Sequence, residues 1–320
     1  MGTADDRQGH EVAIIGGGAA GLSAAVILSR ARRSVIVIDS GHPRNAPAAG
    51  VHGFLGNEGI SPLLLIEKGR EEATDYGARV VQASVTAASG AVKDGFTLLL
   101  SDGSTVQAGQ VLIATGVVDE LPSIPGLAER WGRDVVHCPY CHGWEIRDQR
   151  IGLLATGPMS ALQALMFRQW SEQVWFFPNG MDFPDEQLAK LHAMSITVVP
   201  GTVVCVDAAD DQLTGVVLED QTRINLDALA IPSLTRARLD GLERLGVEVT
   251  ENAAGFAVVT DAAGHTSVPG VWAAGNVVNP ATQVSDSAAD GGRVARAMNT
   301  ELVFARADQA VGADNQTVSA

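Results

Sequence analysis

Cysteine is scarce in this chain, with three residues among 320. So few cysteines cannot build the disulfide framework of a small secreted fold, and two of them stand close together, at Cys138 and Cys141. A close pair of this kind indicates redox or metal chemistry in a reducing compartment. The first ten residues are polar and contain no apolar signal segment, so we expect a cytoplasmic protein.

Positive charge is also in short supply, with 22 Lys and Arg against 37 Asp and Glu and a net charge of −15. An acidic protein without basic runs repels nucleic acid and anionic membranes, so we expect neither as a partner. Residues 12–29 carry no charge and approach the length of a membrane span. Their glycine triplet, however, favours a nucleotide-binding turn over a transmembrane helix.

A glycine turn lies between an apolar strand and a helix. The run 12–15 predicts a buried strand and 20–29 a helix. Between them, Gly16 permits a tight turn, Gly18 lets the backbone approach a pyrophosphate, and Gly21 allows close packing of the helix on the sheet. The free N–H groups at the start of the helix favour phosphate. The spacing predicts a dinucleotide-binding unit.

An acidic residue supports this prediction from the next strand. Residues 35–38 are apolar and predict a second strand, and Asp39 follows at its end. A carboxylate about 20 residues beyond the glycine turn accepts hydrogen bonds from a ribose. Two later strand ends rich in small residues, 114–116 and 269–276, offer backbone along which a long ligand can lie.

A second strand, turn, helix and strand run over 151–177, and a last helix is predicted over 283–305. We predict an α/β fold of two Rossmann-like nucleotide-binding domains, the second inserted into the first. The expected division is 1–118 and 241–320 for the first domain and 119–240 for the inserted one. The polar segment from Asp308 onward is expected to be disordered.

The second glycine turn is degraded. Ala155, Gly157 and Ser160 stand where the first turn has its three glycines, and Pro158 removes an N–H group near the phosphate position. Pro178 occupies the place of the ribose-binding acid and cannot accept a hydrogen bond through its side chain. No Lys or Arg lies between residues 169 and 189 to grip a 2′-phosphate. We therefore expect negligible binding of NADPH, and exclude NADH less firmly.

The Cys138-x-x-Cys141-His142 sequence has several interpretations. It matches the attachment sequence of c-type haem, but that chemistry needs export. A zinc site needs four ligands, and the third cysteine, Cys205, lies far away in an apolar stretch. The two cysteines could also be unpaired structural thiols. Redox exchange fits best, since a proline at the first helical position places Cys138 at a helix start, where thiol pKa values fall. We expect no metal. Either His142 or His137 could act as the base.

With these motifs in this order, residues 10–305 resemble the low-molecular-weight thioredoxin reductases. Two segments, CPYCHGWE (138–145) and VHGFLG (51–56), resemble a narrower branch, the FAD-dependent dithiol oxidases. Those enzymes form disulfides in small natural products such as gliotoxin and holomycin. The resemblance implies FAD as cofactor, a small-molecule dithiol as substrate, molecular oxygen as acceptor with hydrogen peroxide as product, no use of NADPH, and a homodimer.

The resemblance also implies roles for individual residues. Cys138 corresponds to the outer cysteine, which exchanges with the substrate, and Cys141 to the inner one, which reacts with the flavin. Asn276 replaces an aspartate of the family pattern and can still hydrogen-bond a ribityl hydroxyl. The implied FAD contacts are Gly16, Gly18, Ala20, Gly21, Asp39, Arg44, Asn45, Val85, Thr115, Gly116, Asn276, Gln283 and Val284.

Three functions follow from these observations. The first is an FAD-dependent dithiol oxidase with Cys138, Cys141 and His142 as its catalytic residues. The second is an NAD(P)H-dependent thioredoxin or disulfide reductase, which needs a working second nucleotide site. The third is a flavoprotein that senses redox state and binds a partner without turnover.

Overall fold

The computed structural model describes residues 9–252 and 255–318, and the side chains of 313–318 are left undescribed. The chain divides into two compact units. The first unit comprises residues up to 44, 63–118 and 236 onward, and the second comprises 45–62 and 119–235. The segment 45–62 thus groups with the second unit, whereas the sequence division assigned it to the first domain. Its contacts explain the grouping: His52 pairs with Glu145, and Pro47 packs against Gly132.

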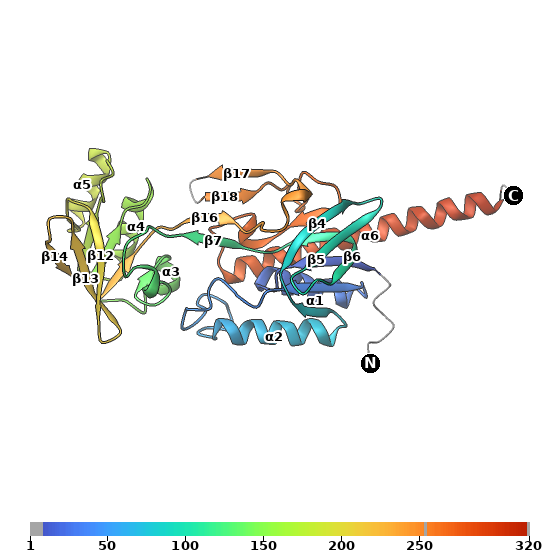
Figure 1. Ribbon diagram of the computed structural model, residues 1–320, viewed down its shortest axis with the longest axis horizontal. Coiled ribbons are helices and arrows are strands. Elements are labelled where there is room, and N and C mark those ends of the chain that lie inside the picture. The colour runs from blue at the N-terminus through green and yellow to red at the C-terminus, as the bar shows by residue number, and fades with distance from the viewer. Residues whose placement is uncertain (1–8, 253–254, 319–320) are drawn as a thin grey trace. The chain divides into compact units, whose positions relative to one another are not determined.

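The first unit is built on a seven-stranded sheet in the order β3-β2-β1-β6-β5-β4, with β19 also pairing with β6 (Figure 1). Strands β1, β2, β3, β6 and β19 run parallel, and β4 and β5 form antiparallel hairpins. Its main elements are β1 (His10–Ile15), α1 (Ala19–Arg30), β2 (Val35–Asp39), α2 (Pro62–Asp75), β3 (Arg79–Gln82), β4 (Val85–Ala91), β5 (Gly95–Leu100), β6 (Thr105–Ile113), β19 (Val271–Ala273), the 3-10 turn η3 (Gly275–Val277) and α6 (Val284–Val318).

Parallel strands buried on both faces need continuous apolar sequence, and this chain supplies it. The side chains of residues 12–15 and 35–38 are at most 5% exposed. The expected strand at 12–15, helix at 20–29 and strand at 35–38 are confirmed, each to within a few residues. Because parallel strands end at one edge of a sheet, the segments that follow β1, β2, β6 and β19 gather there.

The second unit has a five-stranded sheet, β11-β10-β9-β15-β8, with parallel pairing throughout, and a separate antiparallel sheet of β12, β13 and β14. Its elements are η1 (Ala128–Arg130), β8 (Val135–Val136), α3 (Pro139–His142), β9 (Ile151–Leu154), α4 (Ser160–Phe167), β10 (Val174–Phe177), α5 (Asp185–Ala193), β11 (Thr197–Val198), β12 (Val203–Ala209), β13 (Gln212–Leu218), β14 (Arg223–Asn225) and β15 (Ala228–Ala230).

The chain passes between the units along two strands, β7 (Val117–Glu120) and β16 (Leu234–Ala237). They belong to a four-stranded sheet in the order β17-β18-β16-β7, with β17 (Val249–Asn252), β18 (Gly255–Val258) and the turn η2 (Glu243–Leu245) nearby in sequence. With both units built on parallel βαβ sheets, the predicted α/β fold with two Rossmann-like domains is confirmed.

The C-terminal helix α6 corrects one expectation. The helix continues to Val318, so residues 308–318 are helical and not disordered, and residues 319 and 320 lie outside the described residues. Polar, alanine-rich sequence is compatible with an exposed helix, and residues 303–312 are all exposed. The helix is tied to the unit by His265, which contacts Glu301 at 2.5 Å and Asp261 at 2.8 Å. Among the described helices, none combines the length and apolar character needed to cross a bilayer.

Candidate active site

The turn after β1 leaves its backbone open to a ligand. Gly16 has a φ of +105°, and a Cβ there would lie 2.3 Å from the Ala114 carbonyl oxygen. A Cβ on Gly21 would lie 1.9 Å from the Gly16 carbonyl oxygen, so α1 approaches the turn closely only with glycine there. A Cβ on Gly18 would meet no atom within 4 Å. The peptide at Gly18 is therefore accessible to a phosphate-bearing ligand.

Asp39 lies at the carboxyl end of β2, beside this turn. A Cβ on Gly17 would lie 2.8 Å from the Asp39 Cγ atom, which shows how closely the carboxylate approaches the glycines. Its Oδ2 atom pairs with the guanidinium of Arg70 on α2. The sequence analysis missed Arg70, because a partner 31 residues away in the chain leaves no local signal. This ion pair orients the carboxylate at the edge of the sheet.

Thr115 and Gly116 follow β6 at the same edge. Within the described part of the chain, the Thr115 hydroxyl is buried and lacks a hydrogen-bond partner. A buried hydroxyl in that state costs free energy unless a ligand or water satisfies it. Gly116 has a φ of +70° and accepts a hydrogen bond from the Arg238 N–H group through its carbonyl. A polar cofactor bound at this edge could supply the hydrogen-bond partner that the Thr115 hydroxyl lacks.

The segment after β19 is held by a carboxylate of α6. The Gly275 N–H group donates to Asp290 Oδ2 at 2.8 Å, and Arg293 donates to Asp290 Oδ1 at 2.6 Å and 3.0 Å. The Asn276 side-chain amide donates to the Thr282 carbonyl at 2.8 Å and to the Pro280 carbonyl at 3.1 Å. An aspartate could donate neither bond, so asparagine at 276 ties this loop together. Sequence reasoning missed Asp290 and Arg293.

The other expected cofactor contacts vary in their surroundings. Ala20 is buried, and a Cβ on Gly275 would lie 2.8 Å from its methyl group. The Val85 side chain packs in the core, so only its backbone could face a ligand. Gln283 and Val284 are half-buried at the start of α6. Arg44 and Asn45 form part of a turn that spans the boundary between the two units.

In the second turn, after β9, a side chain of the turn itself binds backbone N–H groups of the turn. The Ser160 hydroxyl accepts hydrogen bonds from the Thr156 and Gly157 N–H groups at 3.2 Å and 3.3 Å and donates to the Gly157 carbonyl at 2.7 Å. Ser160 is fully buried, and it takes the place that Gly21 has in the first turn. The N–H groups that would bind a phosphate are therefore already satisfied. The Thr156 hydroxyl is likewise engaged, by the Pro232 carbonyl.

Cys138 and Cys141 are half-buried in the second unit. Cys138 is the N-cap of α3, with Pro139 at the first helical position, and its carbonyl accepts from the Cys141 and His142 N–H groups. This local geometry is as expected from the sequence. The helix is only four residues long, so its dipole, and the lowering of thiol pKa values that a helix start brings, are weaker than at a longer helix.

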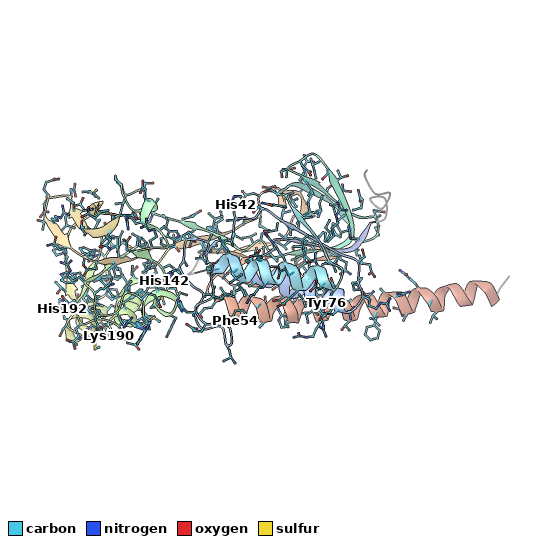
Figure 2. The ribbon with its side chains drawn as sticks, turned by 90° about the horizontal axis from the view of Figure 1, so that it is seen from below. His42, Phe54, Tyr76, His142, Lys190 and His192 are labelled. Atoms are coloured by element: carbon cyan, nitrogen blue, oxygen red, sulfur yellow. The ribbon has the colours of Figure 1, made fainter. Side chains whose placement is uncertain are left out.

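His142 directly follows the second cysteine in the sequence. Both of its ring nitrogens are buried and lack a hydrogen-bond partner among the described residues. Burial lowers the pKa of His142 below its ordinary value, and the nearby charge of Glu145 only partly opposes this shift. The imidazole is therefore neutral near pH 7 and able to accept a proton. Figure 2 marks His142 among the side chains of the second unit.

His137 has a different environment. Its Nδ1 atom lies 3.2 Å from the Ser233 N–H group and 3.2 Å from the Ile231 carbonyl oxygen. The Ser233 hydroxyl in turn donates to Asp119 at 2.7 Å. In either tautomer, Nδ1 is thus engaged with the backbone. These contacts fix the orientation of the His137 ring through Nδ1, whereas neither ring nitrogen of His142 has a hydrogen-bond partner among the described residues.

A βαβ fold with an open glycine turn, joined to a Cys-x-x-Cys pair at a helix start, defines an oxidoreductase that works on dithiols or disulfides. The chain belongs to the pyridine nucleotide-disulphide oxidoreductase family, whose model matches residues 10–299. It is therefore an oxidoreductase of the flavoprotein, thioredoxin-reductase-like class.

Two fungal relatives support this placement. The chain is 33% identical over 274 residues to thioredoxin reductase tcpT of Claviceps purpurea, which covers 82% of this chain and 85% of the relative. It is 32% identical over 292 residues to thioredoxin reductase sirT of Leptosphaeria maculans, covering 85% and 88%. Among solved structures, HlmI has a TM-score of 0.90 at 42% identity and covers 97% of this chain and 98% of its own.

Proposed function

We propose that the protein is an FAD-dependent dithiol oxidase that forms an intramolecular disulfide in a small molecule. The observation that carries the proposal is the contrast between its two nucleotide turns. The first turn has glycine at all three positions of the spacing, whereas the second has Ala155 and Ser160 at the first and third. The Ser160 hydroxyl also accepts hydrogen bonds from two N–H groups of its own turn, although a Cβ on the central glycine would meet no atom within 4 Å in either turn. The segments 51–56 and 138–145, which resemble the dithiol oxidases, also support it.

The residues of the first unit fit FAD. The open Gly16–Gly21 turn would hold the pyrophosphate, and Asp39 would hold the ribose. The unmatched Thr115 hydroxyl and the loop at Asn276 would contact the rest of the cofactor. When bound, FAD would take two electrons from the cysteine pair and pass them to molecular oxygen, which yields hydrogen peroxide.

In the second unit, we assign the exchange of thiols to the cysteine pair and proton transfer to His142. A substrate thiolate attacks the Cys138 sulfur of the Cys138–Cys141 disulfide, and Cys141 leaves as a thiolate. The second substrate thiol then displaces Cys138 as the substrate disulfide closes. The substrate loses two electrons and two protons; the cysteines gain the two electrons, and Cys138 takes up the proton of the second substrate thiol as it leaves. His142, neutral because it is buried, accepts the proton of the incoming thiol.

Rapid mixing without oxygen tests the proposal. The oxidised enzyme is mixed separately with NADPH, NADH and dithiothreitol, and the flavin absorbance is followed. We expect bleaching by dithiothreitol, reversed by oxygen with release of peroxide, and no bleaching by micromolar NADPH. Rapid bleaching by NADPH would identify a reductase instead. A flavin that the dithiol bleaches but that does not turn over with oxygen would identify a redox sensor.

Replacing His142 by glutamine is expected to slow bleaching by dithiothreitol by about 10²-fold or more, because the general base is lost. In the wild-type protein the rate falls as the pH drops below the lowered pKa of His142, since the imidazole is then protonated. In His142→Gln the rate should depend on ionisation of the dithiol itself, so the plateau above the pKa of His142 is lost and the rate rises with pH across the neutral range. His137→Gln serves as the comparison and keeps the plateau. A plateau kept in His142→Gln and lost in His137→Gln would exchange the two roles.

The proposal also includes a cytoplasmic location and a homodimer. The location is inferred from the cysteine pair, because a reducing compartment keeps such thiols available for redox exchange. The homodimer is carried over from the thioredoxin reductases alone. Analytical ultracentrifugation of the FAD-loaded protein measures its oligomeric state, and a homodimer is the expected result.

A further inference from the structure

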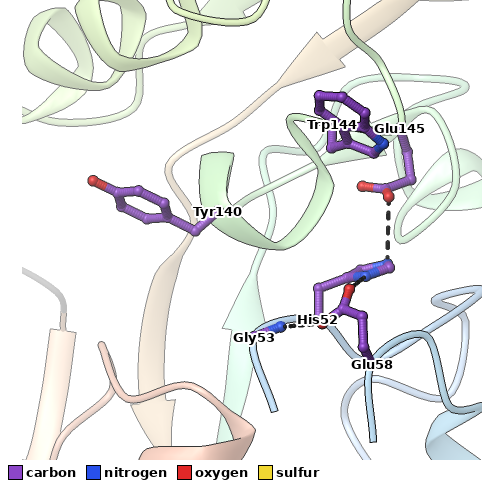
Figure 3. Close-up of a pocket in the computed structure, with 6 residues that line it drawn as sticks. All are labelled: His52, Gly53, Glu58, Tyr140, Trp144 and Glu145. Atoms are coloured by element: carbon purple, nitrogen blue, oxygen red, sulfur yellow. Dashed lines mark hydrogen bonds and ion pairs between the residues drawn. The ribbon is translucent and has the colours of Figure 1, made fainter. Parts of the chain in front are cut away.

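A pocket lies beside the cysteine motif within the second unit. It has a volume of about 430 Å³ and is lined by His52, Gly53, Glu58, Tyr140, Trp144 and Glu145. The first three residues come from the loop 51–60, and the last three come from the cysteine motif and the turn after it (Figure 3). The pocket thus joins the two segments that are far apart in sequence and that resemble the dithiol oxidases.

The loop 51–60 is held in shape by its own hydrogen bonds. The Val51 N–H group donates to the Ile60 carbonyl at 2.8 Å, which closes the loop at its base. Glu58 contacts His52 Nδ1 at 2.6 Å and accepts from the Gly53 N–H group at 2.9 Å. The hydrogen bond from His52, followed by that from Gly53, lowers the pKa of Glu58. Glu58 is therefore a carboxylate at neutral pH.

A second carboxylate faces the same imidazole from the cysteine side. Glu145 Oε1 lies 3.5 Å from His52 Nε2, and Figure 3 shows Glu145 directed at the ring that also meets Glu58. His52 therefore bridges two acids, one on each segment. No Lys or Arg is among the six lining residues. Among the six lining residues themselves, two carboxylates stand against the single imidazole of His52, so the lining is net negative; the Arg147 guanidinium, which stacks on Trp144, lies outside this lining.

The walls of the pocket are two exposed aromatic side chains, Tyr140 at 62% and Trp144 at 64% exposure. Each is held by a neighbour. Tyr140 meets the edge of Trp170 at a centroid distance of 5.9 Å. The Arg147 guanidinium lies 4.2 Å from the centre of the Trp144 ring and donates to the Trp144 carbonyl at 2.6 Å. Restrained aromatic surface next to carboxylates suits a flat, uncharged molecule with N–H donors.

We propose that this pocket receives the body of the dithiol substrate and selects uncharged dithiols over anionic ones, with Glu58 and Glu145 determining the selectivity. This inference rests on the proposed oxidase function. Tyr140 lies between the two cysteines in sequence and Trp144 lies three residues after Cys141, so the cysteine segment itself builds one side of the pocket, although neither sulfur is among its lining residues. An anionic substituent there is repelled by both carboxylates, whereas an amide in its place donates a hydrogen bond to them.

Two probe dithiols that differ in one group test the selectivity. Dihydrolipoamide ends in an uncharged amide, and dihydrolipoate ends in a carboxylate. We expect the FAD-loaded enzyme to oxidise the amide with a kcat/KM about tenfold higher, as two nearby charges predict. Glu58→Gln and Glu145→Gln should each lower this ratio, and the double variant should bring it close to one. The change should come mainly from the KM of dihydrolipoate.

Glu186→Gln is the matched control. Glu186 is an exposed acid of the same unit that pairs with Lys190 on α5 and does not line the pocket. It should leave the ratio unchanged. Equal kcat/KM for the two dithiols in the wild-type enzyme, or a ratio that the double variant leaves unchanged, would overturn the inference. Failure of the oxidase function itself looks different, because then neither dithiol, nor dithiothreitol, bleaches the flavin.

Discussion

Replacing Cys141 by serine is expected to abolish dithiol oxidation, to below about a thousandth of the wild-type rate, while FAD stays bound. Serine cannot form the disulfide that takes up the two electrons, and its hydroxyl is not ionised at neutral pH. Cys138→Ser should have an equally large effect, because either sulfur is needed to close the bond. Oxygen consumption with dithiothreitol and the flavin absorbance of the purified variants are the two measurements.

Cys205 provides the control for this experiment. It lies on β12, with its sulfur 3.6 Å from the Val206 carbonyl oxygen, and takes no part in the cysteine motif. Cys205→Ser should therefore retain wild-type turnover. Turnover that persists in either Cys138→Ser or Cys141→Ser would remove the cysteine pair from the mechanism. Loss of bound FAD in those variants would instead show that the cysteines support the fold of the cofactor site.

Two adjacent glycines of α6 should respond to alanine with opposite signs. A Cβ on Gly291 would lie 2.0 Å from the Ala20 carbonyl oxygen on α1, so Gly291→Ala must push the two helices apart. Overpacking of this kind costs about 1–3 kcal/mol or more. A Cβ on Gly292 would meet only the Arg296 guanidinium, at 3.5 Å, and the Ile27 side chain, at 3.9 Å. Gly292→Ala should stabilise the helix by up to about 1 kcal/mol.

The melting temperature of the protein with excess FAD measures this pair of effects. It should fall by several degrees in Gly291→Ala and rise slightly in Gly292→Ala. Gly291→Ala should also weaken FAD binding, because Ala20 belongs to the cofactor turn and contacts Gly275. A Gly291→Ala variant as stable as the wild-type protein would mean that α1 and α6 do not approach each other as closely as described.

Short-range features of the fold were predictable from the sequence. The strand at 12–15, the glycine turn and the helix at 20–29 follow from apolar patterning and from the backbone freedom of Gly16. The loss of the second turn was also readable, because Ala155 and Ser160 break a spacing that depends only on neighbouring residues. The helix beyond Asp308 was predicted wrongly, since polar composition does not distinguish an exposed helix from a disordered segment.

The partners of the site residues could not be predicted in the same way. Arg70 reaches Asp39 across 31 residues, and Asp290 anchors Gly275 from the neighbouring helix. Such pairs depend on how helices lie against the sheet, and no local pattern encodes that arrangement. The Ser160 hydroxyl shows the same limit. The sequence indicated a missing glycine there, but only the folded turn reveals that the hydroxyl satisfies the phosphate-binding N–H groups.

By itself, then, the sequence determined the α/β class, the first nucleotide turn and the position of the Cys138–Cys141 pair, because each depends on residues within a few positions of one another. The tertiary structure decided which histidine has uncommitted nitrogens and which loop completes the pocket. His52 approaches Glu145 from 93 positions away in the chain (145 − 52), and such packing, like the burial of the His142 ring, is specified only by the whole fold.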